Sequence, residues 1–199
     1  MDRNLIKDYI YEQPIKVVTA LEFSEQKIKY DAIVQNRKID VIDGDEEVSR
    51  AFLLTKLVNE LGYLPERIEI EHEYSAGRAP KLTPRIDVVV RDAVGNAFLF
   101  IEVKSPSEYA TIDKDKTIND QLYQVAALEK ASGRSVKYLV LYTTSESSSG
   151  VNDECIIIDM DEYPTFDEWA IDRNSTNEIP ARYGKAQRKP YIKGSEKDL

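Results

Sequence analysis

Cysteine and histidine are almost absent from this sequence of 199 residues, which contains only Cys155 and His72. A single cysteine excludes an intramolecular disulfide and fits a reducing cytoplasm. With one residue of each type, a structural zinc site is not expected. His72 shares the apolar face of an alternating segment with Ile68, Ile70 and Tyr74. A histidine in that position is more often a satisfied core residue than a catalyst, so we assign it no role.

Long apolar runs and several common motifs are also missing. No run approaches the ~20 apolar residues of a membrane span, and the polar first residues do not resemble a signal peptide. The sequence lacks an internal repeat, a phosphate-binding glycine loop and an ordered Ser-His-Asp set. We therefore expect a cytoplasmic protein that does not contact a membrane.

The composition is that of a soluble globular protein, with 42% hydrophobic and 32% charged residues. The length suits one domain with a substantial core. The net charge of −9 argues against a protein that coats nucleic acid, which usually has a basic surface. Residues 173–199 hold seven Lys or Arg against three acidic residues, a net +4, which leaves −13 for the rest. This basic segment could contact phosphate or a neighbouring domain, or be a solvated tail.

The most informative stretch is a predicted β-hairpin, in which residues 84–91 and 97–104 flank a turn at residues 92–96. Two β-branched or aromatic runs around a short turn with Gly and Asn are typical of a hairpin. A turn centred between Val94 and Gly95 pairs Asp87 with Glu102, Arg85 with Lys104 and Val89 with Phe100. One face then carries Ile86, Val88, Val90, Leu99, Ile101 and Val103. Because both faces are mostly apolar, we expect a central, covered hairpin.

Two carboxylates, Asp87 and Glu102, thus face each other on this hairpin. Their Cβ atoms would lie roughly 5 Å apart, where like charges are destabilising, and burial strengthens the repulsion. A shared proton, the nearby Lys104 or a divalent cation would offset it. Mg²⁺ suits two carboxylates that leave coordination positions open for water and phosphate. The alternative is a hairpin end that reaches solvent, with both charges hydrated.

Two helices carry polar residues on apolar stripes. The first runs from about residue 46 to Leu61, capped by Asp43 or Asp45 and ended by Gly62. Its apolar stripe consists of Glu47, Ala51, Leu54, Val58 and Leu61. Glu47 is therefore either a solvated glutamate that the helix dipole favours in the first turn, or a third acidic group that points at the sheet. The second helix runs from about Ile118 to Ala131. Its Gln121 is either bonded to backbone at the core edge or orients a substrate.

The other elements are expected as follows. A short helix is predicted at 5–11, a strand at 15–20, extended or irregular chain at 28–34 and 37–42, and strands at 67–74, 136–143 and 155–159. Residues 105–117 are predicted to be polar and flexible, and residues 145–150 to form a mobile loop. Thr165 and Glu168 form a capping-box pattern for a short helix that carries Trp169.

The predicted order helix, strand, strand, strand, helix, strand, with an Asp and a Glu-x-Lys on the hairpin, resembles the PD-(D/E)xK nuclease superfamily. Over about residues 28–145 the chain more closely resembles the N-terminal nuclease domain of type I restriction enzyme R subunits. The residues that carry this resemblance are Lys29-Tyr30-Asp31, Asp45 to Arg50, Leu61-Gly62-Tyr63, Glu71, Arg85 to Val90, Ile101 to Lys104, and Gln121.

The resemblance implies an α/β (α+β mixed sheet) fold with a restriction-endonuclease-like αβββαβ core, a central mixed sheet flanked by helices. We divide the chain into an N-terminal extension (1–27), the nuclease domain (28–171) and a basic polar tail or linker (172–199).

The resemblance also implies roles for six residues. Asp87, Glu102 and the backbone carbonyl of Val103 would bind Mg²⁺, with Mn²⁺ as a substitute, and Glu47 would support that metal site. Lys104 would position or activate the attacking water. Gln121 would match the glutamine of the family's Gln-xxx-Tyr motif, although Val125 stands at the tyrosine position and Tyr123 would face elsewhere.

The implied function is that of a Mg²⁺-dependent DNA endonuclease domain of a type I restriction-modification system. The implied partners are DNA, a helicase-like motor domain in the same full-length chain, and modification and specificity subunits. Two alternatives stay open. One is a catalytically silent module of the same fold that binds DNA or a protein partner, and the other is a repair nuclease or resolvase of the same superfamily.

Overall fold

The computed structural model of the protein describes residues 4–74, 83–148 and 150–182. It contains a six-stranded mixed sheet with the strand order β3-β4-β5-β6-β7-β8. These strands are β3 (Val34–Gln35), β4 (Ile68–Glu73), β5 (Arg85–Arg91), β6 (Ala97–Val103), β7 (Val136–Ser147) and β8 (Gly150–Asp159). The pairs β3–β4 and β6–β7 are parallel and the other three are antiparallel. A two-stranded sheet joins β1 (Val18–Glu22) to β2 (Lys27–Tyr30).

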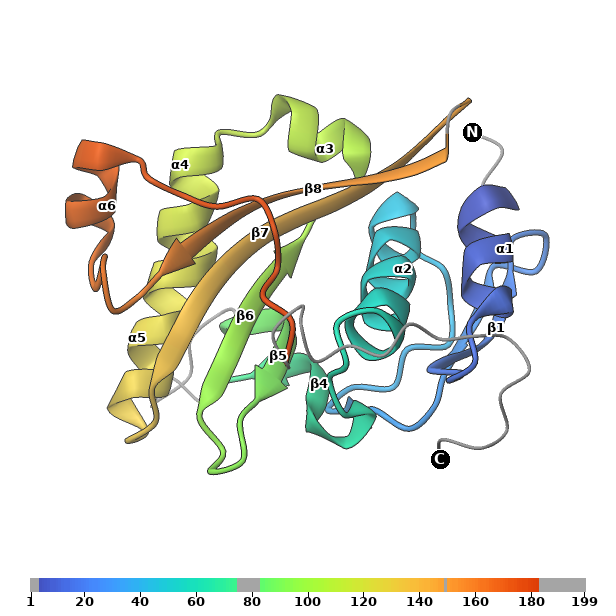
Figure 1. Cartoon of the computed structure of the whole chain (residues 1–199), viewed down its shortest axis with the longest axis horizontal. Helices are drawn as coiled ribbons and strands as arrows, with labels where there is room; N and C mark the ends of the chain where they lie inside the picture. The colour runs from blue at the N-terminus through green and yellow to red at the C-terminus, as the bar shows by residue number, and fades with distance from the viewer. Residues whose placement is uncertain (1–3, 75–82, 149, 183–199) are drawn as a thin grey trace.

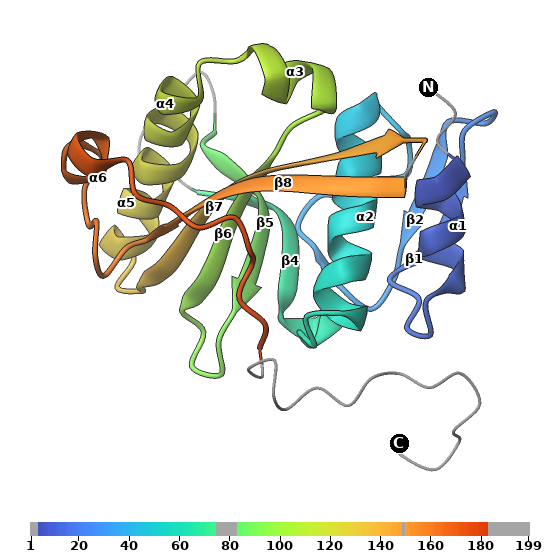
Figure 2. The same ribbon diagram turned by 45° about the horizontal axis from the view of Figure 1, so that its top comes forward.

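Helices cover both faces of the six-stranded sheet (Figure 1). They are α1 (Asn4–Glu12), α2 (Asp45–Asn59), η1 (Pro65–Arg67), α3 (Pro106–Thr111), α4 (Lys114–Thr117), the π-helix η2 (Ile118–Tyr123), α5 (Gln124–Ala131) and α6 (Phe166–Asp172). Helix α2 lies on one face, with α1 and the small sheet beyond it, and α4, η2 and α5 lie on the other (Figure 2). The expected mixed sheet flanked by helices is confirmed. Among the described residues, no helix is long and apolar enough to cross a membrane.

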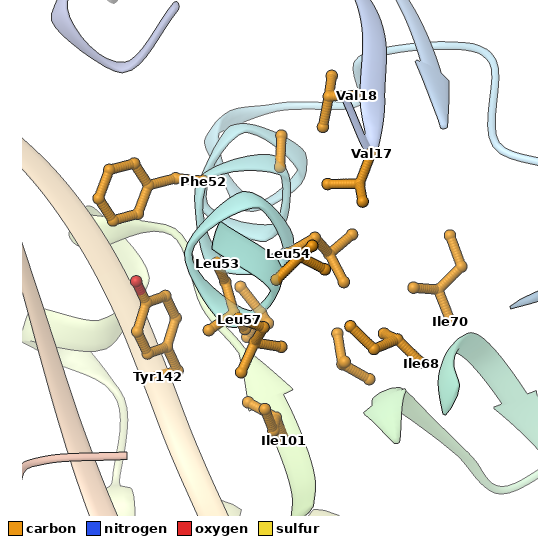
Figure 3. Close-up of a cluster of buried hydrophobic side chains, with 14 of the residues drawn as sticks. Val17, Val18, Phe52, Leu53, Leu54, Leu57, Ile68, Ile70, Ile101 and Tyr142 are labelled. Carbon is orange, nitrogen blue, oxygen red and sulfur yellow. The ribbon is translucent and has the colours of Figure 1, made fainter. Parts of the chain in front are cut away.

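Two apolar cores hold these layers together. The larger lies around α2, whose Leu53, Leu54 and Leu57 are fully buried, and Figure 3 shows Leu57 near Ile101 of β6. The smaller core packs η2 and α5 on the opposite face of the sheet, with Phe100 among its residues. A sheet buried on both faces explains why β5 and β6 read as nearly continuous apolar runs.

The predicted register of the central hairpin is confirmed in its middle part. Val88 pairs with Ile101, Val89 with Phe100 and Val90 with Leu99. Nearer the turn, the register shifts between Val90 and Arg91. The turn residue Gly95 has φ +92°, a conformation that favours glycine.

Regular pairing between β5 and β6 does not reach the end of the hairpin that lies away from the turn, where β5 begins and β6 ends. The backbone N–H of Val103 donates 2.8 Å to Oδ2 of Asp87, so a carboxylate takes that hydrogen bond. The ladder ends at Val88 and Ile101, so it contains neither the predicted Asp87–Glu102 pair nor the predicted Arg85–Lys104 pair. Lys104 lies beyond the end of β6 and its N–H donates to Tyr142 O of β7. The prediction that Ile86 shares the face of Val88 and Val90 is also wrong, since Ile86 belongs to the smaller core.

Helix α2 begins two residues after the first predicted cap. Gly44 is the N-cap, with φ +85° and no side-chain hydrogen bond, so neither Asp43 nor Asp45 caps the helix. Asp45, Glu46 and Glu47 instead fill the first turn, where carboxylates complement the helix dipole. The helix ends at Asn59, and the chain turns away through Gly62 at φ +72°.

The segment predicted to be flexible is helical. Ser105 caps α3 by accepting a hydrogen bond from Glu108 N, and Asp113 caps α4 by accepting one from Lys116 N. The polar residues that suggested flexibility are therefore helix caps. The helix expected at residues 118–131 is present, but its first part is the π-helix η2.

The loop predicted at residues 145–150 is instead largely the end of a long hairpin. Strand β7 continues to Ser147, which pairs with Gly150 at the start of β8. Residue 149 lies outside the described residues. Contacts with helices α1 and α2 support this part of the hairpin. Ile6 N donates 2.6 Å to a Glu146 carboxylate oxygen, and Lys56 of α2 pairs with Asp153.

The other expectations are largely met. The helix predicted at residues 5–11 is α1, and the capping box at Thr165 and Glu168 begins α6. The strand predicted at residues 15–20 is shifted to β1. The strand predicted at residues 67–74 is β4, but its alternation breaks at Glu71, which is buried and has φ +55°.

Candidate functional site

A cavity of about 760 Å³ opens where β5 and β6 separate. Its polar lining comes from several elements and includes Glu46 from α2, Asp87 from β5, Glu102 from β6, Lys104 just after β6, and Gln121 from η2. The structure thus brings four of the residues singled out in the sequence to one place. It does not bring Glu47 there.

Asp87 is held firmly although it is only 4% exposed. Its Oδ2 accepts the 2.8 Å hydrogen bond from Val103 N, and its Oδ1 lies 3.4 Å from a guanidinium nitrogen of Arg50. Both oxygens therefore have donors, which fixes the orientation of the carboxylate. The same hydrogen bond brings the backbone of Val103 beside Asp87.

Glu102 and Lys104 form a buried pair next to Asp87. Lys104 Nζ lies 2.7 Å from Glu102 Oε1. Burial, and then repulsion from Asp87, raise the pKa of Glu102 well above its usual value. Burial opposes the charge on Lys104, but attraction to Glu102 outweighs it and raises the pKa of Lys104. Negative charge thus gathers here, and Lys104 and the neighbouring Arg50 partly balance it.

Backbone hydrogen bonds fix the position of Lys104. Its N–H donates 2.9 Å to Tyr142 O, and its own carbonyl accepts a 2.9 Å hydrogen bond from Thr143 Oγ1. Strand β7 therefore holds the residue although β6 has already ended at Val103. A side chain anchored in this way is preorganised to place its ammonium group in the cavity.

Glu47 and Glu46 are adjacent on α2 but have different surroundings. Glu47 is buried, where one oxygen accepts a hydrogen bond from Tyr30 and the other lies 2.7 Å from Arg50. Glu46 faces the cavity, and burial, followed by repulsion from Asp87, raises its pKa to about 7. The helical stripe used for the sequence prediction did not indicate Glu46 as well, because α2 is buried on more than one side. The supporting role expected for Glu47 stays a prediction.

Arg50 is a second residue of this region that the sequence reasoning did not select. It is 3% exposed and pairs with Glu46, Glu47 and Asp87. It also lies 3.0 Å from Glu71. The available sequence signal was its place four residues after Glu46 and three after Glu47, positions that share a helix face.

Gln121 reaches the cavity from η2, where the helix is widened by its π-turn. Such turns occur often at functional sites. Val125, the residue at the family's tyrosine position, also lines the cavity. Tyr123 points away, as expected, since it is buried in the smaller core and donates 3.1 Å to Tyr163 O.

His72 is outside this cavity. Its Nδ1 lies 2.7 Å from a Glu69 carboxylate oxygen, and its ring contacts that of Tyr74 edge-on. The expectation of a histidine with satisfied contacts fits this position, although the ring is partly exposed.

The donor set fits a hard cation that keeps some of its own water. Asp87 and Glu102 supply two carboxylates at one place, where burial, followed by repulsion from Asp87, raises the pKa of Glu102. Among the residues that the structure describes, no three His, Cys, Asp or Glu side chains are arranged to hold a metal ion. Mg²⁺ suits such a site because it is commonly bound by one or two carboxylates and completed by water and phosphate.

One comparison with known proteins gives a match. The sequence model of a family described as "Type I restriction enzyme R protein N terminus (HSDR_N)" matches residues 45–149, just over half of the chain. The matched range begins with α2 and includes Asp87, Glu102, Lys104 and Gln121. No curated protein matches the chain.

Proposed function

The chain belongs to the family of type I restriction enzyme R protein N termini, and on this basis we propose that it is a Mg²⁺-dependent DNA endonuclease domain. The observation that carries the proposal is the buried Asp87–Glu102 pair with Lys104 at its side in one cavity. Two carboxylates and a lysine at an open cavity are the groups that metal-assisted phosphodiester hydrolysis needs.

In the proposed reaction, the oxygen of a water molecule attacks phosphorus and the bond to one ester oxygen breaks, which leaves a phosphate end and a hydroxyl end. Asp87, Glu102 and the carbonyl of Val103 would hold Mg²⁺, which supplies a Lewis acid for the phosphate and lowers the pKa of water. Lys104 carries positive charge at the cavity wall, where it orients the water and stabilises the charge that develops on phosphate. Glu46, rather than Glu47, faces the same space.

The family description also bears on the partners. We propose DNA as the substrate, a motor domain elsewhere in the full-length protein, and modification and specificity subunits as the assembly in which the domain works. Sequence recognition would then belong to those other subunits.

A catalytically silent module of the same fold is the second candidate. Val125 at the family's tyrosine position lines the cavity and favours it. Calorimetric titration with Mg²⁺ or Mn²⁺ distinguishes the two candidates, because a silent module that has lost its site would show no binding that depends on Glu102. Cleavage assays on linear, branched and circular DNA would distinguish a repair nuclease.

The test of the proposal is DNA cleavage by the variants Asp87→Asn and Lys104→Met. We expect each to lower Mg²⁺-dependent cleavage by about 10²-fold or more, because Asp87→Asn weakens the binding of Mg²⁺ and Lys104→Met removes a positive charge beside the reacting phosphate. Thermal unfolding, followed by circular dichroism, shows whether the variants remain folded.

The matched controls are Glu73→Gln and Lys130→Gln, which change an exposed residue of the same charge elsewhere. Both should cleave like the unchanged protein. Cleavage at the unchanged rate by both Asp87→Asn and Lys104→Met contradicts the proposal.

A further inference from the structure

Arg50 is a buried cation surrounded by carboxylates. Its NH1 lies 2.7 Å from Glu47 Oε2, and its NH2 lies 3.3 Å from Glu46 Oε1, 3.0 Å from Glu71 Oε1 and 3.4 Å from Asp87 Oδ1. Four acidic side chains from three elements thus direct an oxygen at one guanidinium group. A guanidinium carries a single permanent charge and several donors in a rigid fork, which suits it to this place.

Glu71 reaches Arg50 at a cost in backbone energy. It lies inside β4 with φ +55°, in the left-handed region that non-glycine residues rarely adopt. Its Oε1 meets Arg50, and its Oε2 lies 3.0 Å from Nε of Arg85. A strained conformation persists only where surrounding contacts maintain it, and such conformations cluster at functional sites. The position of this carboxylate is therefore a specific feature of the site.

Carboxylate oxygens that converge in this way are also the ligands of hard divalent cations. With Arg50 between them, Glu47, Glu71 and Asp87 are not arranged to hold a metal ion, and only removal of its guanidinium would leave them as an oxygen-rich set beside the Asp87–Glu102 pair. With Arg50 present, each of these three carboxylates has an oxygen engaged by the guanidinium. Asp87 belongs to both groups, since its other oxygen accepts from Val103 N.

Resting on the proposed function, we propose that the guanidinium of Arg50 takes the place of a second metal ion, so that the site binds a single divalent cation at Asp87 and Glu102. Arg50 then acts as a positioning residue that holds Asp87 and neutralises Glu47 and Glu71. The fixed cation cannot diffuse away, so this part of the site is organised before metal or DNA arrives.

The experiment is a calorimetric titration with Mn²⁺ of the unchanged chain and of Arg50→Gln, Arg50→Lys and Arg50→Gln/Glu71→Gln. We expect one Mn²⁺ per chain for the unchanged protein and two for Arg50→Gln, because the vacated oxygens then hold an ion. Arg50→Lys keeps the positive charge and should bind one. The double variant removes one positive and one negative charge together and should also bind one.

The matched control is Lys56→Gln, which removes a cation from the same helix but one that pairs with Asp153 away from the cavity. It should bind one Mn²⁺. Thermal unfolding with and without Mn²⁺ gives a second readout, since Mn²⁺ should stabilise Arg50→Gln more than the unchanged protein.

Two Mn²⁺ in the unchanged chain, or one in folded Arg50→Gln, overturns the inference and leaves the proposed endonuclease function standing. Failure of Arg50→Gln to fold at every Mn²⁺ concentration also overturns it, because Mn²⁺ should refill an empty cation site. If the unchanged chain binds no Mn²⁺, the proposed metal-dependent function fails as well.

Discussion

Glu46 and Glu47 show how much the surroundings of a single residue decide. They are neighbours in the first turn of α2, yet one faces the cavity with Asp87 and the other is enclosed between Tyr30 and Arg50. Glu47 therefore supports the site through Arg50, whereas Glu46 is the glutamate available to a ligand in the cavity.

The raised pKa of Glu46 predicts a pH dependence. Its value of about 7 in the folded state lies above the usual 4.5, so between these pH values the folded protein keeps a proton that the unfolded chain releases. In the absence of divalent ions, the contribution of Glu46 to the free energy of unfolding should therefore be largest below pH 4.5 and fall as the pH rises through 7. Glu46→Gln should remove this contribution.

The measurement is urea unfolding in a chelator at about pH 5 and about pH 8, for the unchanged protein and for Glu46→Gln. The unchanged protein should lose more stability across this interval than the variant. Glu66→Gln, which changes an exposed glutamate, serves as the control. An identical pH dependence in Glu46→Gln and the unchanged protein would show that Glu46 does not hold the proton.

At the scale of elements, η2 determines which side chains reach the cavity. A regular helix was expected over residues 118–131, whereas the structure has a π-turn at Ile118–Tyr123 followed by α5. Gln121 is exposed on the cavity side, and Tyr123 is buried on the other. Because Gln121 is not part of a packed core, its replacement should affect substrate orientation more than folding.

The prediction is that Gln121→Ala lowers cleavage by about tenfold through loss of orientation, with the midpoint of thermal unfolding unchanged. Cleavage rates at saturating DNA and at saturating Mg²⁺ measure the first effect, and circular dichroism measures the second. Lys130→Ala, an exposed position on α5, is the control. A large loss of stability in Gln121→Ala would instead mean that the amide is structural.

Two other elements differ from the sequence prediction for physical reasons. The polar segment at residues 105–117 folds as α3 and α4 because Ser105 and Asp113 accept hydrogen bonds from backbone N–H groups. Ser105 with Glu108 three residues later is a helix-start pattern like that of Thr165 and Glu168, and the sequence prediction did not use it. The polar end of the β7–β8 hairpin is ordered because it contacts α1 and α2, through Glu146 and Asp153. Such tertiary contacts override local composition.

At the scale of the whole molecule, the N-terminal residues belong to the same core as the site helix. Ile6, Ile10 and Leu21 are buried in the cluster that contains α2, although the family match begins only at residue 45. The boundary at residue 27 stays a prediction. Packing of α1 against α2 should nevertheless make the stability of the site depend on α1.

We therefore predict that Ile10→Ala, at a residue 1% exposed, lowers the free energy of unfolding by about 2–5 kcal/mol, because it leaves a cavity in the core. Leu5→Ala on the same helix, where Leu5 is 43% exposed, should cost less than about 0.5 kcal/mol. Urea unfolding measures both. Equal and small effects would mean that α1 is an appendage of the folded domain.

The sequence by itself determined the hairpin and the register of its middle part, from Val88–Ile101 to Val90–Leu99, because alternation along a strand has a fixed period of two. It also placed Asp87, Glu102 and Lys104 at the same end of the hairpin, where the regular ladder stops and the cavity opens. The apolar faces of residues 84–104 also predicted that the hairpin is covered on both sides, whereas the mixed sheet flanked by helices was implied by the family resemblance. Only the tertiary structure decided that Glu46 faces the cavity and that Arg50 fills the space between Glu47, Glu71 and Asp87. Those positions depend on how α2 is rotated against two packed layers and on a strained residue within β4, and neither is encoded in a local pattern.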